Sequence, residues 1–291
     1  MKTGSWIKQH IYLFLLLPGI IFVLFFLIVP FAWIIRVSFY ENVRGGYMTS
    51  AWTLENYFKF LLDPWYLKNV LFKSFQISLI TSVIAIVLAY PVALYVSRSS
   101  GRMKQILLTL VLSPLLIGMV CLIFGWLVIF RTNGILNQFT MWLGLNEEPI
   151  KYMYNLRGVM ICLVYISIPY IVLNLLDTLS RINPSLEEAA WNIGCNKWQS
   201  FWKIIFPLSV PGMYAGSLIV FALNFCAFAV PLMIGAQRIP MIGLVMYRQA
   251  YELMNLPFAS AMAVILLVVS LVFLLIYSRI VNRLFFKKLG V

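Results

Sequence analysis

Six long apolar segments constrain this chain more than any other feature of its sequence. An α-helix needs roughly 20 apolar residues to cross about 30 Å of hydrocarbon. The segments that meet this requirement run near residues 11–35, 74–96, 106–130, 158–176, 210–234 and 259–280. The pattern predicts an all-α fold, a polytopic membrane bundle of six transmembrane helices that forms a single domain over residues 1–291.

The composition and the first segment support a multi-pass membrane protein. Hydrophobic residues make up 63% of the chain and charged residues 11%, whereas globular proteins average about 45–50% and about 25%. The first segment follows Lys2 and Lys8, as a secretory signal would. Its apolar run is too long for a signal and no small-residue cleavage site follows, so we expect a retained span.

The distribution of Lys and Arg predicts the orientation. With the N-terminus in the cytoplasm, the inside segments hold 12 basic residues in 65 positions and the outside segments hold 10 in 89. The same arrangement places six of the nine acidic residues outside. We therefore expect both termini in the cytoplasm, together with the loop 177–209 and the segment 97–105.

The net charge of +13 does not indicate a nucleic-acid partner, because the basic residues are scattered around six spans and form no single face. Topology and anionic lipid headgroups account for them. A metal site is not expected either, since the chain has one histidine, His10, and its four cysteines show no metal-binding spacing.

Two short amphipathic segments lie outside the predicted spans. Residues 54–62 place Leu54, Tyr57, Phe58 and Leu61 on one helical face before Asp63-Pro64 ends the pattern. Residues 135–143 form a similar piece. We expect both to lie along the outer membrane surface.

The loop 177–209 carries local signals for a helix that starts near residue 184. Asn183 is a suitable N-cap with Pro184 at the first helical position, while Ser185 and Glu188 spell an alternative capping box. Either start puts Glu187 and Glu188 in the first turn, where the helix dipole favours negative charge. Gly194 then supplies a left-handed stop.

A second helix is predicted directly after this stop. Asn196 with Gln199 repeats the cap signature, and the apolar face that follows consists of Trp198, Phe201, Trp202 and Ile205. We expect Pro207 to end this helix, Pro211-Gly212 to open the next span, and the two tryptophans and the phenylalanine to anchor the helix on the bundle. A partner that moves the first helix would then move the span as well.

The same loop resembles the EAA loop of ABC-importer permeases. That pattern runs EAA, three residues, Gly, nine residues and Ile-x-Leu-Pro; here Glu188-Ala189-Ala190, Gly194 and Ile204-Ile205-Phe206-Pro207 keep the spacing, with Phe206 where Leu is usual. Taken singly, each residue has a simpler explanation as an ordinary helix former or cap. The joint spacing, in the loop between the fourth and fifth spans, favours the motif.

A wider part of the chain, from about Trp52 to Tyr277, resembles spermidine/putrescine-type permease subunits. The matching stretches are Leu54-Glu55-Asn56-Tyr57, Ala89-Tyr90-Pro91-Val92-Ala93, Leu186-Glu187-Glu188-Ala189-Ala190, Pro207-Leu208-Ser209-Val210-Pro211-Gly212, Ala215-Gly216-Ser217-Leu218, Ile242-Gly243 and Leu256-Pro257-Phe258. This resemblance implies a type I ABC-importer permease fold in the bacterial inner membrane.

The resemblance also implies partners and coupling residues. The chain would pair with a second permease subunit, usually a different chain, above a dimer of ATP-binding subunits and below an extracytoplasmic solute-binding protein. Coupling to the ATPase would involve Glu187, Glu188, Ala189, Ala190, Trp191, Gly194, Ile204 and Pro207. ATP and magnesium would bind the partner, because this chain has no GxxxxGK[ST] sequence and is not expected to be an enzyme.

The transported solute stays open at this point. Relatives with this pattern resemble importers of polyamines, ferric iron, phosphonates, thiosulfate, opines or amino-acid derivatives. Many carry an acid just before a Phe-x-x-Pro step in the fifth span, where this chain has Ala227, and no Asp or Glu lies within the six spans. Candidates for the solute path are Trp126, Tyr165, Asn224 and Phe228, each of which is also explained by helix packing.

Two other classes of function are less consistent with the sequence. An ion-coupled secondary transporter normally has intramembrane charges, which the predicted spans lack. A membrane-embedded enzyme needs a metal constellation, a carboxylate pair or a Ser/His pair, which a single His10 does not provide.

Overall fold

The computed structural model describes residues 3–43, 47–235 and 238–283. The side chain of His10 and the basic residues Lys287 and Lys288 lie outside the described parts. The chain divides into two compact units, one of Met1–Leu62 with Arg248–Leu267 and one of Asp63–Tyr247 with Val268–Val291.

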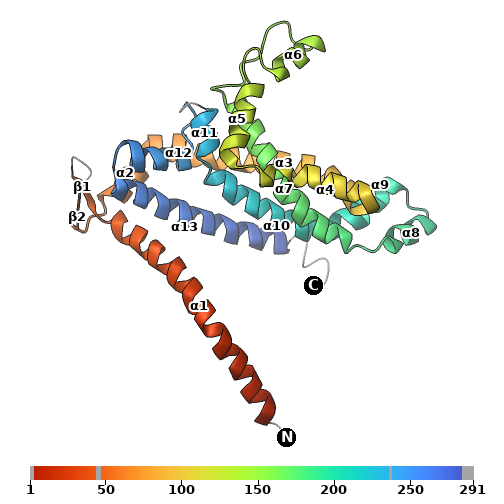
Figure 1. Cartoon of the computed structure of the whole chain (residues 1–291), viewed down its shortest axis with the longest axis horizontal. Helices are drawn as coiled ribbons and strands as arrows, with labels where there is room; N and C mark the ends of the chain where they lie inside the picture. Colours follow the sequence, from red (N-terminus) through yellow and green to blue (C-terminus); the bar gives the residue numbers. More distant parts are fainter. Residues whose placement is uncertain (1–2, 44–46, 236–237, 284–291) are drawn as a thin grey trace. The chain divides into compact units, whose positions relative to one another are not determined.

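The first unit combines the long helix α1 with two short paired strands and shorter helical segments (Figure 1). Its elements are α1 (Thr3–Ser38), β1 (Glu41–Val43) paired antiparallel with β2 (Tyr47–Thr49), α2 (Glu55–Leu62), η3 (Arg248–Glu252) and the first half of α13 (Leu256–Val281). Asn56 fixes α2 against the end of α1 by donating to the carbonyls of Ser38 and Tyr40 at 3.0 and 2.9 Å.

The helix α2 confirms the amphipathic segment predicted over 54–62. It ends at Leu62, and Asp63 Oδ1 accepts a hydrogen bond from the Trp65 amide at 2.8 Å. Leu54, Phe58 and Leu61 are about half exposed, whereas Tyr57 turns inward and bonds Ser38 at 2.6 Å. An exposed apolar face of this kind is suited to a membrane surface.

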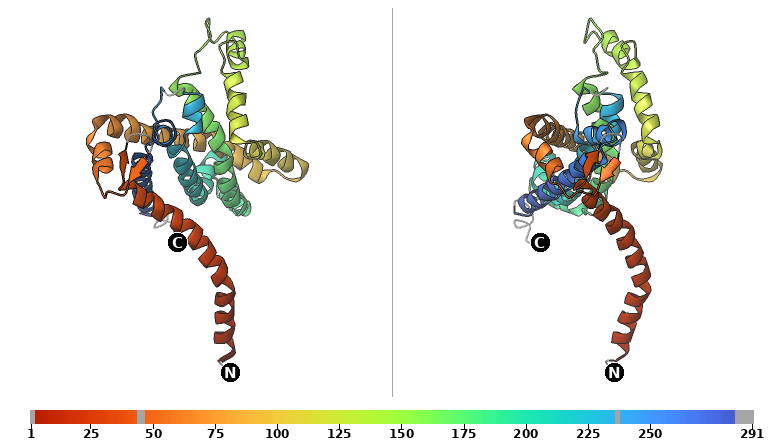
Figure 2. Two further views of the ribbon diagram at one scale, coloured as in Figure 1. Left: turned by 60° about the vertical axis from the view of Figure 1, so that its left-hand side comes forward. Right: turned by 90° about the vertical axis from the view of Figure 1, so that its left-hand side faces the viewer.

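The second unit contains most of the membrane-length helices. Its elements are η1 (Tyr66–Phe72), α3 (Lys73–Arg98), α4 (Gly101–Leu116), α5 (Met119–Ile129), α6 (Ile135–Trp142), α7 (Leu156–Ser180), α8 (Ser185–Asn192), α9 (Lys197–Ser200), η2 (Phe201–Ile205), α10 (Phe206–Phe225), α11 (Ala229–Met233), α12 (Ile242–Tyr247) and the second half of α13. Here α3, α7 and α10 lie side by side and form the core (Figure 1 and Figure 2).

Small residues let these three helices approach closely. A β-carbon on Gly212 of α10 would lie 2.5 Å from Thr178 Oγ1 and 2.7 Å from the Asn174 carbonyl of α7. Most of the buried residues of α3 are Ser, Thr or Ala, and the hydroxyls of Ser74, Ser78 and Ser82 donate to carbonyls four residues earlier at 2.6–2.7 Å. These bonds satisfy the hydroxyls where no water is available.

Five described helices are long and apolar enough to cross a membrane, or six if the bent pair α4 and α5 counts as one span. The structure divides the predicted segment 106–130 between these two helices, and the helix direction bends by 101° at the break between them. Ile117 and Gly118 between them are extended, and Pro114 precedes the break. The predicted segment 210–234 also differs, because α10 starts earlier and ends at Phe225.

Candidate functional site

The loop between α7 and α10 contains the short helix α8, whose start is set by Asn183. The Asn183 Oδ1 atom accepts a hydrogen bond from the Ser185 amide at 3.0 Å, directly after Pro184. This geometry corresponds to the first of the two predicted caps; Pro184 already has helical backbone angles, and α8 itself begins at Ser185. Glu187 and Glu188 occupy the first turn of α8, as predicted.

A glycine elbow ends α8 and a capping box opens α9. Gly194 has φ +89°, and the amide of Cys195 donates to the Ala190 carbonyl at 3.0 Å, which closes a Schellman-type turn. Asn196 Oδ1 accepts from the Gln199 amide at 2.7 Å, and Gln199 Oε1 accepts from the Asn196 amide at 3.1 Å. The predicted stop and the second cap are both confirmed.

The prediction that Pro207 ends the second helix is wrong. The helical stretch is continuous from Lys197 to Phe225, over 29 residues, and contains both Pro207 and Pro211. A π-helical turn, η2, ends at Ile205, two residues before Pro207. Because such a turn already breaks the regular i to i−4 bonding, a residue without an amide hydrogen fits after it. We call the stretch Lys197–Phe225 the rod; at 1.5 Å per residue it is roughly 43 Å long.

The predicted anchoring is wrong for the two tryptophans and confirmed for the phenylalanine, Phe201. Trp198 is 69% exposed and Trp202 47% exposed. Contact with α3 is made by Phe201, whose ring lies 5.6 Å from that of Tyr90, and Ile205 is buried. The π turn adds one residue to a helical turn and so rotates the apolar face away from the 3.6-residue register that the prediction assumed.

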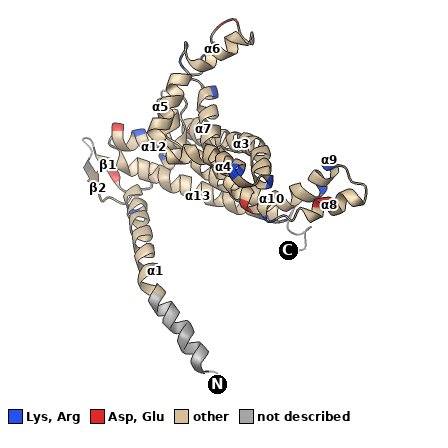
Figure 3. Ribbon diagram, turned by 45° about the vertical axis from the view of Figure 1, so that its right-hand side comes forward, with Lys and Arg blue, Asp and Glu red and all other residues tan. Residues whose placement is uncertain are grey.

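The remaining motif residues divide into exposed and buried positions. Glu188 and Ala189 are exposed on α8 and Ala190 is buried, while Ile204 and Pro207 are half-buried in the rod. Two exposed apolar side chains flank the elbow, Trp191 and Ile193, the latter 82% exposed. Figure 3 shows acidic and basic residues around α8 and α9, whereas the middle of the long helices is almost free of charge.

Asn224 lies in a buried polar cluster that connects three helices. Its Nδ2 atom donates to Thr81 Oγ1 of α3 and to Ser167 Oγ of α7, both at 3.1 Å. Asn224 is 3% exposed, and Thr81 and Ser167 are 0% and 2% exposed. Both hydrogens of the amide are therefore used within the bundle, so the structure favours a packing role for Asn224 over the predicted place in the solute path.

The aromatic candidates form two separate pairs. Trp126 of α5 meets Tyr165 of α7 edge to face at 5.1 Å, in a cluster with buried apolar residues. Phe228, at the break between α10 and α11, is 43% exposed and stacks on Tyr247 of α12 at 5.3 Å. Only the second pair offers an accessible aromatic face of the kind that attracts a cation.

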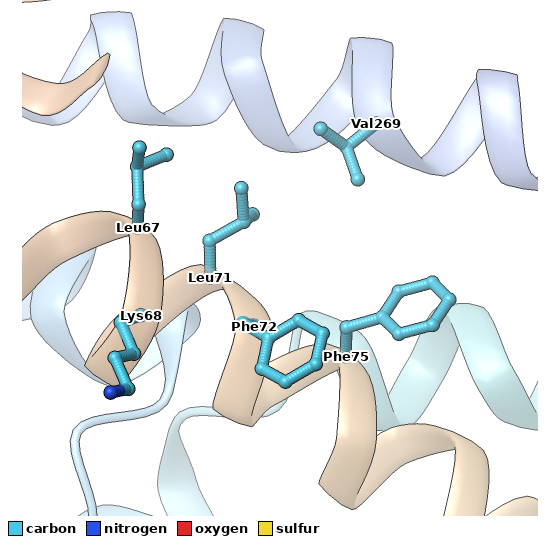
Figure 4. A pocket seen from close by; sticks show the side chains of 6 residues that line it. All are labelled: Leu67, Lys68, Leu71, Phe72, Phe75 and Val269. Carbon is cyan, nitrogen blue, oxygen red and sulfur yellow. The ribbon is translucent and has the colours of Figure 1, made fainter. Parts of the chain in front are cut away.

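Two grooves on the second unit differ in chemistry. A groove of about 460 Å³ between η1, α3 and α13 is lined by Leu67, Leu71, Phe72, Phe75 and Val269, and the Lys68 side chain turns away from Val269 (Figure 4). Such a lining suits acyl chains and not a charged solute. The other, of about 490 Å³, lies beside α8 and is lined by Leu94, Glu187, Trp191, Lys197, Trp198, Phe201 and Ile205.

Sequence reasoning missed three links that the structure reveals. Arg98 of α3 forms an ion pair with Glu187 of α8. Tyr90 of α3 hydrogen-bonds Ser209 of α10 at 2.9 Å, and Thr81 bonds Asn224. The hydroxyl residues at 74, 78, 81 and 82 were a signal for a polar helix interface. Their cross-helix partners are far away in sequence, since Asn224 lies 143 residues from Thr81 and Ile242, whose amide bonds Ser74, lies 168 residues from it.

Comparison with known proteins defines the class. Residues 64–286 match the family described as binding-protein-dependent transport system inner membrane component. The chain belongs to this family, and it is a permease subunit of a binding-protein-dependent ABC importer with a type I permease-like fold.

Among curated proteins, the chain is similar to spermidine/putrescine transport system permease proteins PotB. It is 34% identical to that of Salmonella typhimurium over 265 residues, which cover 91% of each chain. Identity to the Escherichia coli K12 protein is 33% over 261 residues, with 89% of this chain and 94% of the relative covered. The molybdenum transport permease ModB of Azotobacter vinelandii is 28% identical over 160 residues, covering 55% of this chain and 69% of ModB.

Among solved structures, the fold is similar to a chain of a bacterial alginate ABC transporter in complex with its alginate-bound periplasmic protein. The TM-score is 0.76 at 18% identity, with 97% and 98% of the two chains covered. A chain of the MetNI methionine ABC transporter in an inward-facing form gives a TM-score of 0.56 at 19% identity, covering 76% of this chain and 96% of that one.

Proposed function

We propose that this chain is one of two permease subunits of a polyamine ABC importer in the bacterial inner membrane, and that α8 is its docking helix for an ATP-binding subunit. The spermidine and putrescine named for its relatives support the polyamine class. The positive-inside count supports a cytoplasmic position for α8, on the side where ATP is found.

The observation that carries the docking role is the short connection from α8 to the long rod and so to the bundle. Gly194 joins the C-terminal end of α8 to the rod, and the rod reaches Asn224 in the polar cluster without a helical break. A load applied to α8 is thereby delivered to the three-helix core. Closure of an ATPase dimer on ATP would then turn the pore outward, by rigid-body movement of packed elements.

The surface of α8 fits a protein partner. Glu188 and Ala189 are exposed, so another surface can approach the backbone closely at Ala189. Trp191 and Ile193 add exposed apolar area on the same short segment, and exposed apolar patches of this kind mark interaction sites. The second permease subunit and the solute-binding protein follow from the importer class.

The absence of Asp and Glu from the predicted spans bears on how a polyamine passes. A cationic amine in the path then requires aromatic faces, carbonyl groups or residues of the partner permease. Phe228, which is 43% exposed and stacks on Tyr247, is one aromatic surface among the described residues that fits that need. We place the first discrimination among solutes in the binding protein.

Reconstitution tests the proposal. The chain would be co-expressed with its partner permease and ATPase, placed in proteoliposomes, and supplied with the binding protein and labelled spermidine or putrescine. We expect uptake that requires ATP and persists without an ion gradient. Uptake driven by an ion gradient alone would refute the ABC class, and uptake of molybdate, thiosulfate or ferric iron without polyamines would refute the solute class.

A pair of variants tests the docking helix in the same preparation. Glu188→Lys reverses a charge on the exposed face of α8, and Glu252→Lys reverses an exposed charge on η3 as the matched control. We expect Glu188→Lys alone to lower the amount of ATPase that co-purifies with the permease. Equal co-purification for both variants would remove α8 as the docking element.

A further inference from the structure

An ion pair connects α8 to the end of α3, 89 residues away in sequence. Arg98 is the last residue of α3, and its guanidinium donates to the Glu187 carboxylate in the first turn of α8. The two side chains are 31% and 17% exposed. Among the described residues it is the one ion pair that joins two helices, since the others, Asp177–Arg181 and Arg248–Glu252, join residues four apart.

The ion pair holds the opposite end of α8 from the elbow. The main packing contacts of α8 go to α9 and η2, which follow Gly194. At its start α8 is joined to α7 only by the short non-helical link 181–184, so a push on α8 can rotate it about Gly194. Arg98 supplies a second attachment near the start of α8, so a push on α8 displaces its attachments instead of rotating the helix about Gly194.

The helix α3 is in turn fastened to the rod. Tyr90 Oη and Ser209 Oγ lie 2.9 Å apart, and Asn224 Nδ2 donates to Thr81 Oγ1 at 3.1 Å. The elements α8, α3 and the rod therefore form a closed frame, joined by the ion pair, by these two hydrogen bonds and by the elbow.

We propose that Arg98 is a positioning residue for energy coupling: it holds α8 through Glu187, so that movement of α8 is transmitted to α3 and the rod together. The inference rests on the proposed docking role of α8. It adds a second route of transmission, through α3, to the route through Gly194.

The fold of α8 should survive the loss of Arg98. Asn183 and the Schellman-type turn cap α8 by local bonds that do not involve Arg98. Glu187 in the first turn remains favoured by the helix dipole without its partner. Removal of Arg98 should therefore change the transmission of movement and leave the assembly intact.

The experiment compares solute transported per ATP hydrolysed in proteoliposomes that contain the complete importer and its binding protein. In R98M the apolar stem of the side chain is retained and the charge is lost. We expect the ratio to fall about fivefold, which corresponds to the free energy of about 1 kcal/mol of a partly exposed ion pair. The ATPase should co-purify at the wild-type level. R98K, which keeps the charge, should retain most of the wild-type ratio. The double variant R98E/E187R should transport more solute per ATP than R98E or E187R alone.

R181M is the matched control. Arg181 forms an ion pair with Asp177 at the end of α7, a few residues before α8, and the two side chains are 78% and 66% exposed. We expect it to behave as wild type. A wild-type ratio in R98M, a loss in R98M that R98K does not relieve, or an equal loss in R181M would overturn the role of Arg98. Failure of the wild-type importer to move any solute with ATP would instead overturn the proposed function together with this inference.

Discussion

Replacement of Gly194 by alanine tests the elbow most directly. Gly194 has φ +89°, and a β-carbon built on it meets no atom within 4 Å. The cost of Gly194→Ala is therefore a backbone cost alone, about 1–2 kcal/mol for a residue with a side chain in the left-handed region. The native elbow conformation should therefore be populated about 5- to 30-fold less, relative to other conformations, than in the wild type.

The expected result is a coupling defect in a folded protein. The caps at Asn183 and Asn196 are local, so α8 and α9 should still form while their relative angle is less well defined. The assay measures solute transported per ATP hydrolysed, together with the thermal midpoint of the purified complex. We expect the ratio to fall several-fold and the midpoint to change little.

Gly144 provides the matched control. It has φ +70° and also meets no atom within 4 Å, but it follows α6 and lies outside the α8 region. Gly144→Ala carries the same backbone cost and should leave the ratio unchanged. A wild-type ratio in Gly194→Ala, or an equal loss in Gly144→Ala, would refute the argument that the elbow transmits movement.

Three further predictions concern single residues. Gly212→Ala should prevent normal packing of α10 on α7, because its β-carbon would lie 2.5 Å from Thr178 Oγ1; the yield of monodisperse protein checks this, with Gly125→Ala, which meets no atom within 4 Å, expected to be neutral. Asn224→Ala should lower the stability of the bundle by about 1–3 kcal/mol, seen as a lower thermal midpoint in detergent; a changed KM for solute with an unchanged midpoint would instead make Asn224 a solute ligand. Ile193→Ala should weaken ATPase co-purification without lowering the midpoint, because the side chain is 82% exposed; a lower midpoint with intact binding would contradict this.

Local signals in the sequence were sufficient to predict the elbow at Gly194. The caps at Asn183 and Asn196 and the stop at Gly194 connect atoms within a few residues, so their geometry follows from the residue types alone. The long apolar segments likewise predicted a helical membrane bundle, because hydrocarbon thickness fixes the length of a span.

The π turn before Pro207 was not predictable from these local rules. Proline normally ends a helix, and the 3.6-residue period placed Trp198 and Trp202 on the packed face. In the structure, packing of Phe201 and Ile205 against α3 and its neighbours selects a wider turn that the local sequence does not specify. The break at Ile117–Gly118 was missed for a similar reason, since the apolar pattern continues across it.

The sequence by itself determined that the chain is a multi-pass helical membrane protein and where the caps and the glycine stop of the loop 177–209 lie, since these depend on composition and on contacts between near neighbours. Only the tertiary structure decided which groups are joined across helices, such as Arg98 with Glu187 and Asn224 with Thr81, 143 residues apart. The physical reason is that a polar side chain in an apolar helix must find a partner, but its own sequence does not say which helix supplies it.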